Sequence, residues 1–440
     1  MAMRKKPRRV KIRQEQDDWA ATPSRDEIPM APNTKKRRRN LKAAPDKRGN
    51  APAVKPKKPK KAKSFEVVEG GVLSRLNRHR RSMIWVSAVA VIAVLILIGN
   101  LLIPAGLGEW MQNGFCTWGG GDGLPVTLED DTVRGLYTRG SLSFVLTDSS
   151  LFAYSGNGKE VTALQHGYLT PVADVSQTRT LLYDRGNYSL RVDTLGRNLV
   201  NEEFEDAIVT ADLCDSGAVA VAFDDAEYAS TVLVYNKRFS PCFKQSYSEE
   251  TVTAVQLSPN GKTLAIVTVR SEGGAFASTL YLYQVKTGAK LCQEKISGSM
   301  IAAVRSNRDR LFIASNDTLV SCRWDGSDRR SYDVSNISYL SGQEGAALAV
   351  VFNPNGERND TVLLLDRKGN EAGRFDLGGT GNRLCVNRSK VFALSGDEVT
   401  VYDFEGNRLD SFAVGYEASY LAPSGGGLVL TSDMKLQFHE

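Results

Sequence analysis

The chain has 440 residues, with 56 Lys+Arg, 50 Asp+Glu and a formal net charge of +6. Its three histidines and six cysteines leave little material for Ser-His-Asp, Cys-His or His-ligated metal chemistry. The charge is unevenly distributed: residues 1–82 hold 26 basic and 8 acidic residues, a charge of +18, and residues 83–440 hold the other 30 and 42, a charge of −12.

Residues 1–82 are predicted to be a disordered basic tail. They contain two aromatics, Trp19 and Phe65, and cannot bury enough apolar surface to offset chain entropy. Clustered basic residues are attracted to anionic lipid, and the predicted lipid contacts are Lys35, Lys36, Arg37, Arg38, Arg39, Lys57, Lys58, Lys60, Lys61 and Lys63. Binding of the tail to a nucleic-acid backbone is an alternative that rests on charge alone.

Residues 83–103 are 21 consecutive positions without a charged side chain. A helix of this length spans roughly 30 Å, the hydrocarbon thickness of a bilayer, so the segment is predicted to be a transmembrane helix. No cleavage signal of small residues follows it, which favours a retained anchor. Arg78, Arg80 and Arg81 precede it, and positive residues stay on the cytoplasmic side. We therefore expect a single-pass cell-membrane protein with a cytoplasmic N-terminus and with residues 104–440 outside.

Residues 104–121 are predicted to be a flexible linker. The glycine-rich run at 119–123 is followed by a strand pattern and not by a helix, so it does not predict a phosphate site. Trp110 and Trp118 are expected at the membrane interface. Cys116 is the candidate for an intermolecular disulfide, and the oligomeric state stays open.

From residue 122 onward the pattern predicts an all-β domain of short strands and tight turns. A recurring unit consists of an apolar strand that ends in a large residue, then a polar residue, then a turn that usually carries glycine. The polar residue recurs at intervals of 36 to 48 residues, at Ser155, Asp193, Asn236, Gln284, Asp325, Asp366, Asp403 and His439. Four antiparallel strands of about five or six residues need this period.

This repeat predicts an eight-bladed β-propeller over residues 122–440. Seven blades are the alternative if a terminal hairpin is irregular, and a β-sandwich is the simpler architecture that needs no such period. The last copy stops after its third strand. Residues 124–128 supply a fourth strand, which would close the ring and remove an open sheet edge.

Three short motifs carry a resemblance to known propellers. The turn SPNGK at 258–262 resembles the first turn of WD40 blades, and Trp324-Asp325 resembles the WD dipeptide. Residues 285–291 look like the turn of pyrroloquinoline-quinone-type repeats. The whole arrangement resembles an uncharacterised clostridial, Gram-positive family of single-pass membrane-anchored β-propeller proteins. Similarity to the quinone-type propellers of outer-membrane assembly lipoproteins implies a non-catalytic scaffold, without their lipidated cysteine and without a bound quinone.

The propeller sequence offers few candidates for chemistry. His166 and His439 lie in different blades, and the adjacent carboxylates at 130–131, 224–225 and 249–250 fall in predicted loops. We therefore expect no catalytic residue, cofactor or metal, and a scaffold that binds a cell-envelope protein or polymer on a propeller face or loop rim. The alternative is a sensor or a carboxylate-based enzyme with its site in the propeller channel.

Overall fold

The structure is a computed structural model that describes residues 73–102, 106–128, 132–297, 300–341, 348–353, 356, 358–380, 382–416, 418–425, 427–432 and 435–439. The predicted lipid-contacting residues of the tail lie outside these ranges. Arg78, Arg80 and Arg81 belong to a described helix, but their side chains lie outside the described part. The disorder and lipid contacts of the tail stay predictions.

Two helices precede the strands: α1 at Leu73–Leu102 and α2 at Leu107–Thr117. Within the described part of the chain, no helix combines the length and the apolar character needed to cross a bilayer. The predicted span at 83–103 extends past the described side chains of α1, which run from 83 to 99, and it stays a prediction.

The structure differs from the predicted flexible linker at 104–121, because α2 occupies most of it. Gly108 and Gly114 lower the intrinsic helix propensity of this segment. Hydrogen bonds to the propeller compensate for this, including one of 2.7 Å from Asn113 Nδ2 to the carbonyl oxygen of Thr178. The glycine-rich run is also held, since the Gly123 amide donates to the Asn157 carbonyl at 3.0 Å.

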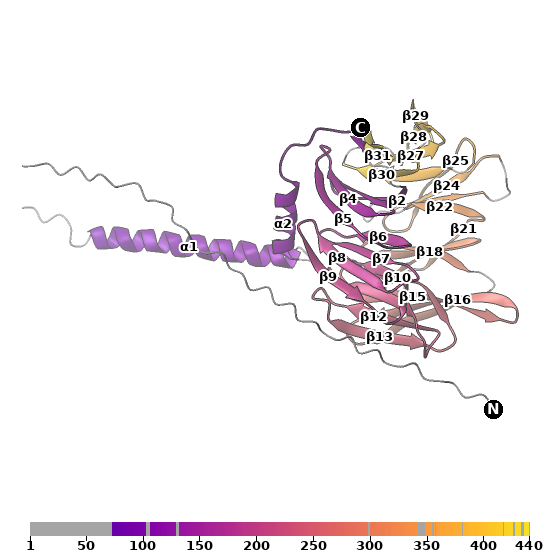
Figure 1. Ribbon diagram of the computed structural model, residues 1–440, viewed down its shortest axis with the longest axis horizontal. Coiled ribbons are helices and arrows are strands. Elements are labelled where there is room, and N and C mark those ends of the chain that lie inside the picture. Colours follow the sequence, from indigo (N-terminus) through magenta and orange to yellow (C-terminus); the bar gives the residue numbers. More distant parts are fainter. Residues whose placement is uncertain are drawn as a thin grey trace, which may run out of the picture. The chain divides into compact units, whose positions relative to one another are not determined.

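The described strands form eight antiparallel four-stranded sheets, which are the blades of a propeller (Figure 1). The first, innermost strands of blades one to eight are β2 (Val133–Arg139), β6 (Pro171–Val175), β10 (Ala207–Leu213), β14 (Thr251–Leu257), β18 (Ile301–Ser306), β22 (Ile337–Ser341), β26 (Arg383–Asn387) and β30 (Tyr420–Ser424). The second strands are β3 (Leu142–Thr147), β7 (Thr180–Asp184), β11 (Val219–Asp224), β15 (Thr263–Glu272), β19 (Arg310–Ser315), β23 (Leu348–Phe352), β27 (Lys390–Ser395) and β31 (Gly427–Thr431).

The third strands are β4 (Ser150–Ser155), β8 (Ser189–Thr194), β12 (Ser230–Tyr235), β16 (Ala275–Gln284), β20 (Thr318–Arg323), β24 (Thr361–Leu365), β28 (Glu398–Tyr402) and β32 (Lys435–His439). The outermost strands are β5 (Glu160–Gln165), β9 (Arg197–Glu203), β13 (Pro241–Tyr247), β17 (Lys290–Ser297), β21 (Arg330–Asp333), β25 (Glu371–Asp376), β29 (Arg408–Ala413) and β1 (Val126–Thr127). The prediction of eight blades is therefore confirmed.

The hydrophobic core is divided among the interfaces between neighbouring blades. In β15, Leu264 and Ile266 pack toward the third blade, whereas Ala265 and Val267 pack toward the fifth. Successive side chains of a strand point to opposite faces, so a blade with a neighbour on each side buries both sets. This is why second strands such as β23 are apolar and buried at every position.

The ring closes by a strand from the start of the domain. β1 pairs with β32, with Val126 opposite Leu436 and Thr127 opposite Lys435, and so completes the eighth blade. The predicted closure by residues 124–128 is confirmed, although the paired strand is only Val126–Thr127. Leu128, which is 6% exposed, joins the core between the first and eighth blades.

The two propeller faces collect different connections. Antiparallel order places the turns from first to second and from third to fourth strands on one face, and all other connections on the opposite face. α2 contacts the first kind of turn, because Lys159 Nζ donates to the Cys116 carbonyl at 3.1 Å and Asn113 bonds to Thr178. We call this the α2 face, and its opposite the far face.

Candidate functional site

A central cavity of about 920 Å³ lies between the first strands of the eight blades. The penultimate residues of seven of these strands line it, and they are Thr138, Asp174, Asp212, Gln256, Arg305, Leu340 and Pro423. The polar members come from the first five blades. The propeller repeat therefore brings into one ring side chains that are about 40 residues apart in the chain.

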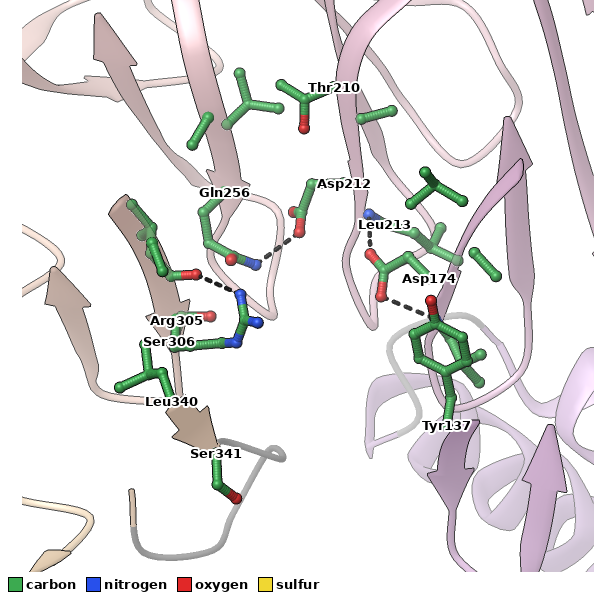
Figure 2. Close-up of a pocket in the computed structure, with 18 of the residues that line it drawn as sticks. Tyr137, Asp174, Thr210, Asp212, Leu213, Gln256, Arg305, Ser306, Leu340 and Ser341 are labelled. Carbon is green, nitrogen blue, oxygen red and sulfur yellow. Dashed lines mark hydrogen bonds between the residues drawn. The ribbon is translucent and has the colours of Figure 1, made fainter. Parts of the chain in front are cut away.

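The carboxylates of this ring bond to the next blade. The Leu213 amide donates to Asp174 Oδ2 at 2.8 Å, and the Leu257 amide donates to Asp212 Oδ2 at 2.7 Å. Gln256 Nε2 adds a 2.6 Å hydrogen bond to Asp212 Oδ1, and Figure 2 shows this pair across the cavity wall. Each carboxylate thus satisfies a backbone donor of its neighbour, which is a structural role.

Asp174 is the carboxylate whose ionisation the cavity perturbs. Burial raises the pKa of Asp174, against the opposing effect of hydrogen bonds from the Leu213 and Val175 amides. The positive charges of Arg139 and Arg305 also oppose this increase. Arg139 is ion-paired with Asp215. Arg305 Nη1 donates at 3.0 Å to the carbonyl oxygen of Val304, the preceding residue. A carboxyl with a raised pKa beside a guanidinium can bind a proton or a polar ligand.

The other sequence candidates do not converge on this cavity. The described carboxylate pair at 224–225 lies at the far-face end of β11, and the pair at 249–250 lies in the far-face connection before β14. The pair at 130–131 lies outside the described residues. No group of three or more His, Cys, Asp or Glu suited to a metal occurs in the described ranges. Cys322 and Cys385 are buried, and burial raises the pKa of the Cys322 thiol to about 11.

The far face carries exposed apolar side chains. Seven large hydrophobic residues of the described propeller are exposed, and five of them, 41% to 84% exposed, belong to far-face connections or hairpin tips. These five form the far-face apolar set: Leu169, Tyr188, Tyr228, Phe276 and Met300. They come in order from the connections of blades one to five. The β15–β16 hairpin, which carries Phe276, has longer strands than its neighbours and projects beyond them (Figure 1).

Around Tyr188 and Tyr228, the members of this set in blades two and three, exposed acidic side chains outnumber the exposed Arg185 of the β7–β8 connection. Exposed carboxylates at the far-face ends of blades two and three and in the connections beside them are Glu202, Glu203, Glu205, Asp224, Glu227 and Glu249. Sequence reasoning had no means of finding this surface, because its members are spread over about 130 residues and only the propeller order gathers them.

Helix α2 is the second feature that sequence reasoning missed. Arg179 Nη2 and Nε donate to Glu109 Oε1 and Oε2 at 2.6 and 2.9 Å, with side chains 7% and 16% exposed. Arg179 Nη1 continues to the Lys237 carbonyl at 2.8 Å. One buried guanidinium thus joins α2 to blades two and three. The spacing of Glu109, Gln112, Asn113 and Cys116 at helical intervals was the available signal.

The fold defines an eight-bladed β-propeller. Residues 137–437 match the family of unknown function DUF5711, and the chain belongs to this family. No curated protein matches the sequence. The predicted membership of a membrane-anchored clostridial family stays a prediction.

Solved structures share the fold. The computationally designed Ika8 protein has a TM-score of 0.53 and 15% identity, covering 71% of this chain and 98% of its own. BamB from Moraxella catarrhalis has a TM-score of 0.50 and 12% identity, with coverage of 72% and 98%. The C-terminal WD40 domain of Sif2 has a TM-score of 0.50 and 13% identity, with coverage of 72% and 97%. The predicted likeness to WD40 propellers is therefore confirmed at the level of fold.

Proposed function

We propose that this protein is a membrane-anchored β-propeller that acts as a non-catalytic binding scaffold outside the cell membrane. The partner is a protein or polymer of the cell envelope. The far-face apolar set carries the proposal, because exposed large apolar residues from successive loops on one face mark an interaction surface. Rigid blades that present loops are a common binding architecture.

The charge of the far face defines the chemistry of the partner. Six exposed carboxylates lie at the far-face ends of blades two and three, beside Tyr188 and Tyr228, and they outnumber the exposed Arg185 of the same region. A partner that buries Tyr188 and Tyr228 must neutralise this charge, since unpaired carboxylates are costly to desolvate. The partner surface is therefore basic and has an apolar centre.

Two observations support the membrane anchor. Residues 1–82 carry a charge of +18 and the remainder carries −12. The positive-inside rule places the basic side of a membrane span in the cytoplasm, which agrees with a cytoplasmic tail and an external propeller. The described large apolar side chains of α1, from Met83 to Ile98, are 43% to 73% exposed. A helix with exposed apolar side chains on every side needs an apolar environment to cover it.

A photo-crosslinking experiment tests the scaffold function in living cells. A photoreactive amino acid replaces Phe276 in the full chain, and a matched control replaces Leu409, which is also exposed but lies in the outer strand β29. We expect a discrete cross-linked product at position 276 that disappears when Tyr228 is replaced by Glu. Equal cross-linking at both positions, or none at 276, would contradict the proposed surface.

One observation favours the alternative of a sensor or enzyme in the channel. Asp174 combines a pKa raised by burial with a place in a cavity large enough for a small ligand. Its hydrogen bond from Leu213 gives it a structural role already, so the scaffold is the better supported function. Turnover of a cell-wall glycan or peptide by the protein, abolished by Asp174→Asn, would favour the enzyme over the scaffold.

A further inference from the structure

α2 has two chemically distinct sides. Glu109, Asn113 and Cys116 face the propeller, where the first two bond to Arg179 and Thr178 and the third packs against the core between the first two blades. The opposite side carries Trp110, Met111, Phe115 and Trp118, which are 46% to 77% exposed. A helix fixed on one side by a buried ion pair holds the other side in one orientation.

The exposed side of α2 has the composition of a membrane-interface segment. Trp is enriched at the level of lipid headgroups, where its ring is amphipathic, and Phe and Met add apolar area. The Phe115 and Trp118 rings are stacked with centroids 6.4 Å apart, so they form one continuous apolar surface. Water is a poor environment for such a surface.

The turns on the same face are basic. Exposed cations in the described α2-face turns of blades two to seven include Arg197, Lys237, Arg238, Lys262, Lys286, Lys290, Arg308, Arg329, Arg367, Lys368, Arg388 and Lys390. They outnumber the exposed carboxylates of the same turns, which are Asp309, Asp325, Asp328 and Glu405. The far face of blades two and three is acidic, as described above. The propeller is therefore electrically asymmetric between its faces, with positive charge on the side that carries α2.

We infer that the α2 face lies on an anionic bilayer surface. The exposed side of α2 enters the lipid interface, and the basic turns contact anionic headgroups, each of which attracts a nearby Lys or Arg. The inference rests on the proposed membrane anchor and deepens it, because it states which face of the propeller meets the membrane. The far-face apolar set then points away from the bilayer and is accessible to a partner.

Two features select lipid over another occupant of this surface. Leu107 of α2 packs against Gly99 of α1: a Cβ atom built on Gly99 would lie only 3.1 Å from Leu107 Cδ2. The exposed side of α2 therefore continues directly from the apolar segment of α1. A second copy of the chain, packed face to face, would bring the same basic turns into opposition, and like charges repel. An anionic bilayer supplies both an apolar layer and complementary charge.

Tryptophan quenching tests the inference on the full chain in nanodiscs made with plain or brominated phosphatidylglycerol. The emission lost on changing Trp110 and Trp118 to Phe reports α2, and the emission lost with Trp85→Phe reports the anchor. Trp324, which lies in an α2-face turn and donates to the Asn307 carbonyl, is present in every variant and therefore cancels from both differences. We expect bromolipid to quench the α2 difference by at least half. Quenching of the Trp85 difference alone would overturn the inference and leave the anchor intact, whereas quenching of neither would overturn both.

Lysine acetylation tests the charge contribution separately. In phosphatidylglycerol nanodiscs, Lys237, Lys262 and Lys368 on the α2 face should react several-fold more slowly than in phosphatidylcholine nanodiscs. Lys435, an exposed residue at the far-face end of β32, should react at the same rate in both. Equal rates for the α2-face lysines in the two lipids would show that these turns do not contact the headgroups and would overturn that part of the inference.

Discussion

The ion pair between Glu109 and Arg179 makes a sharp prediction about how α2 is held. Glu109→Gln keeps the size of the side chain but replaces one acceptor oxygen by a donor that faces the guanidinium. Arg179, 7% exposed, then loses its counter-charge while its bonds to blade three persist. Removal of one partner from a buried pair costs about 3–5 kcal/mol if the surroundings stay in place.

Here the surroundings can respond, because α2 can separate from the propeller and let water reach Arg179. The cost then appears as undocking of α2, and the blades stay folded. A loss of about 3 kcal/mol corresponds to an increase of roughly a hundredfold in the undocked population. The Leu195 amide reports undocking directly, since it donates to Asn113 Oδ1 at 3.3 Å.

Hydrogen exchange of the full chain measures this change. We expect Glu109→Gln to accelerate exchange of the α2 amides and of the Leu195 amide by about two orders of magnitude, without change in buried β11. The matched control is Glu371→Gln, which breaks an exposed Arg374 pair with side chains 38% and 43% exposed and should have little effect. Unchanged α2 exchange would refute the role of the ion pair, and equal loss of protection in β11 would refute independent docking.

Three further predictions concern the ring, the cavity and the topology. Leu128→Ala should lower the free energy of unfolding, measured by chemical denaturation, by about 2–5 kcal/mol, because it leaves a cavity in the core between the first and eighth blades. Leu409→Ala, at an exposed position, is its control. Equal losses of stability in the two variants would contradict the role of Leu128 in closing the ring. For Asp174, burial raises the folded pKa above the unfolded value of about 3.9, so its contribution to stability is full at lower pH and is lost as pH rises through the folded pKa. The unfolding free energy of the parent minus that of Asp174→Asn should therefore fall from about pH 4 to pH 7, and a flat or rising difference would contradict the assignment. Protease applied to intact cells should remove the propeller and spare a tag at residue 1. Neutralising Arg78, Arg80 and Arg81 should lower the fraction of chains with this orientation. Loss of the tag with retention of the propeller would show the opposite topology.

The number of blades and the closure of the ring follow from the sequence alone. A four-stranded blade is formed by 36 to 48 consecutive residues, so the pattern of its strands and turns can be recognised locally and its repetition gives the number of blades. The missing last strand also has a local signature, since an apolar segment at 124–128 precedes the first complete blade. These features depend on short-range pattern and on the rule that a repeat array leaves no open edge.

The roles of individual side chains were decided by tertiary structure. In the sequence, Asp174 is only one polar residue in a predicted strand. Its role depends on the next blade, whose Leu213 amide lies 2.8 Å from the Asp174 carboxylate. The segment of α2 has weak helix propensity, and contacts between Glu109 and Arg179, 70 residues apart, stabilise it as a helix. The separation of basic and acidic turns onto opposite faces has the same origin, because turns that alternate along the chain are sorted by the antiparallel order of every blade.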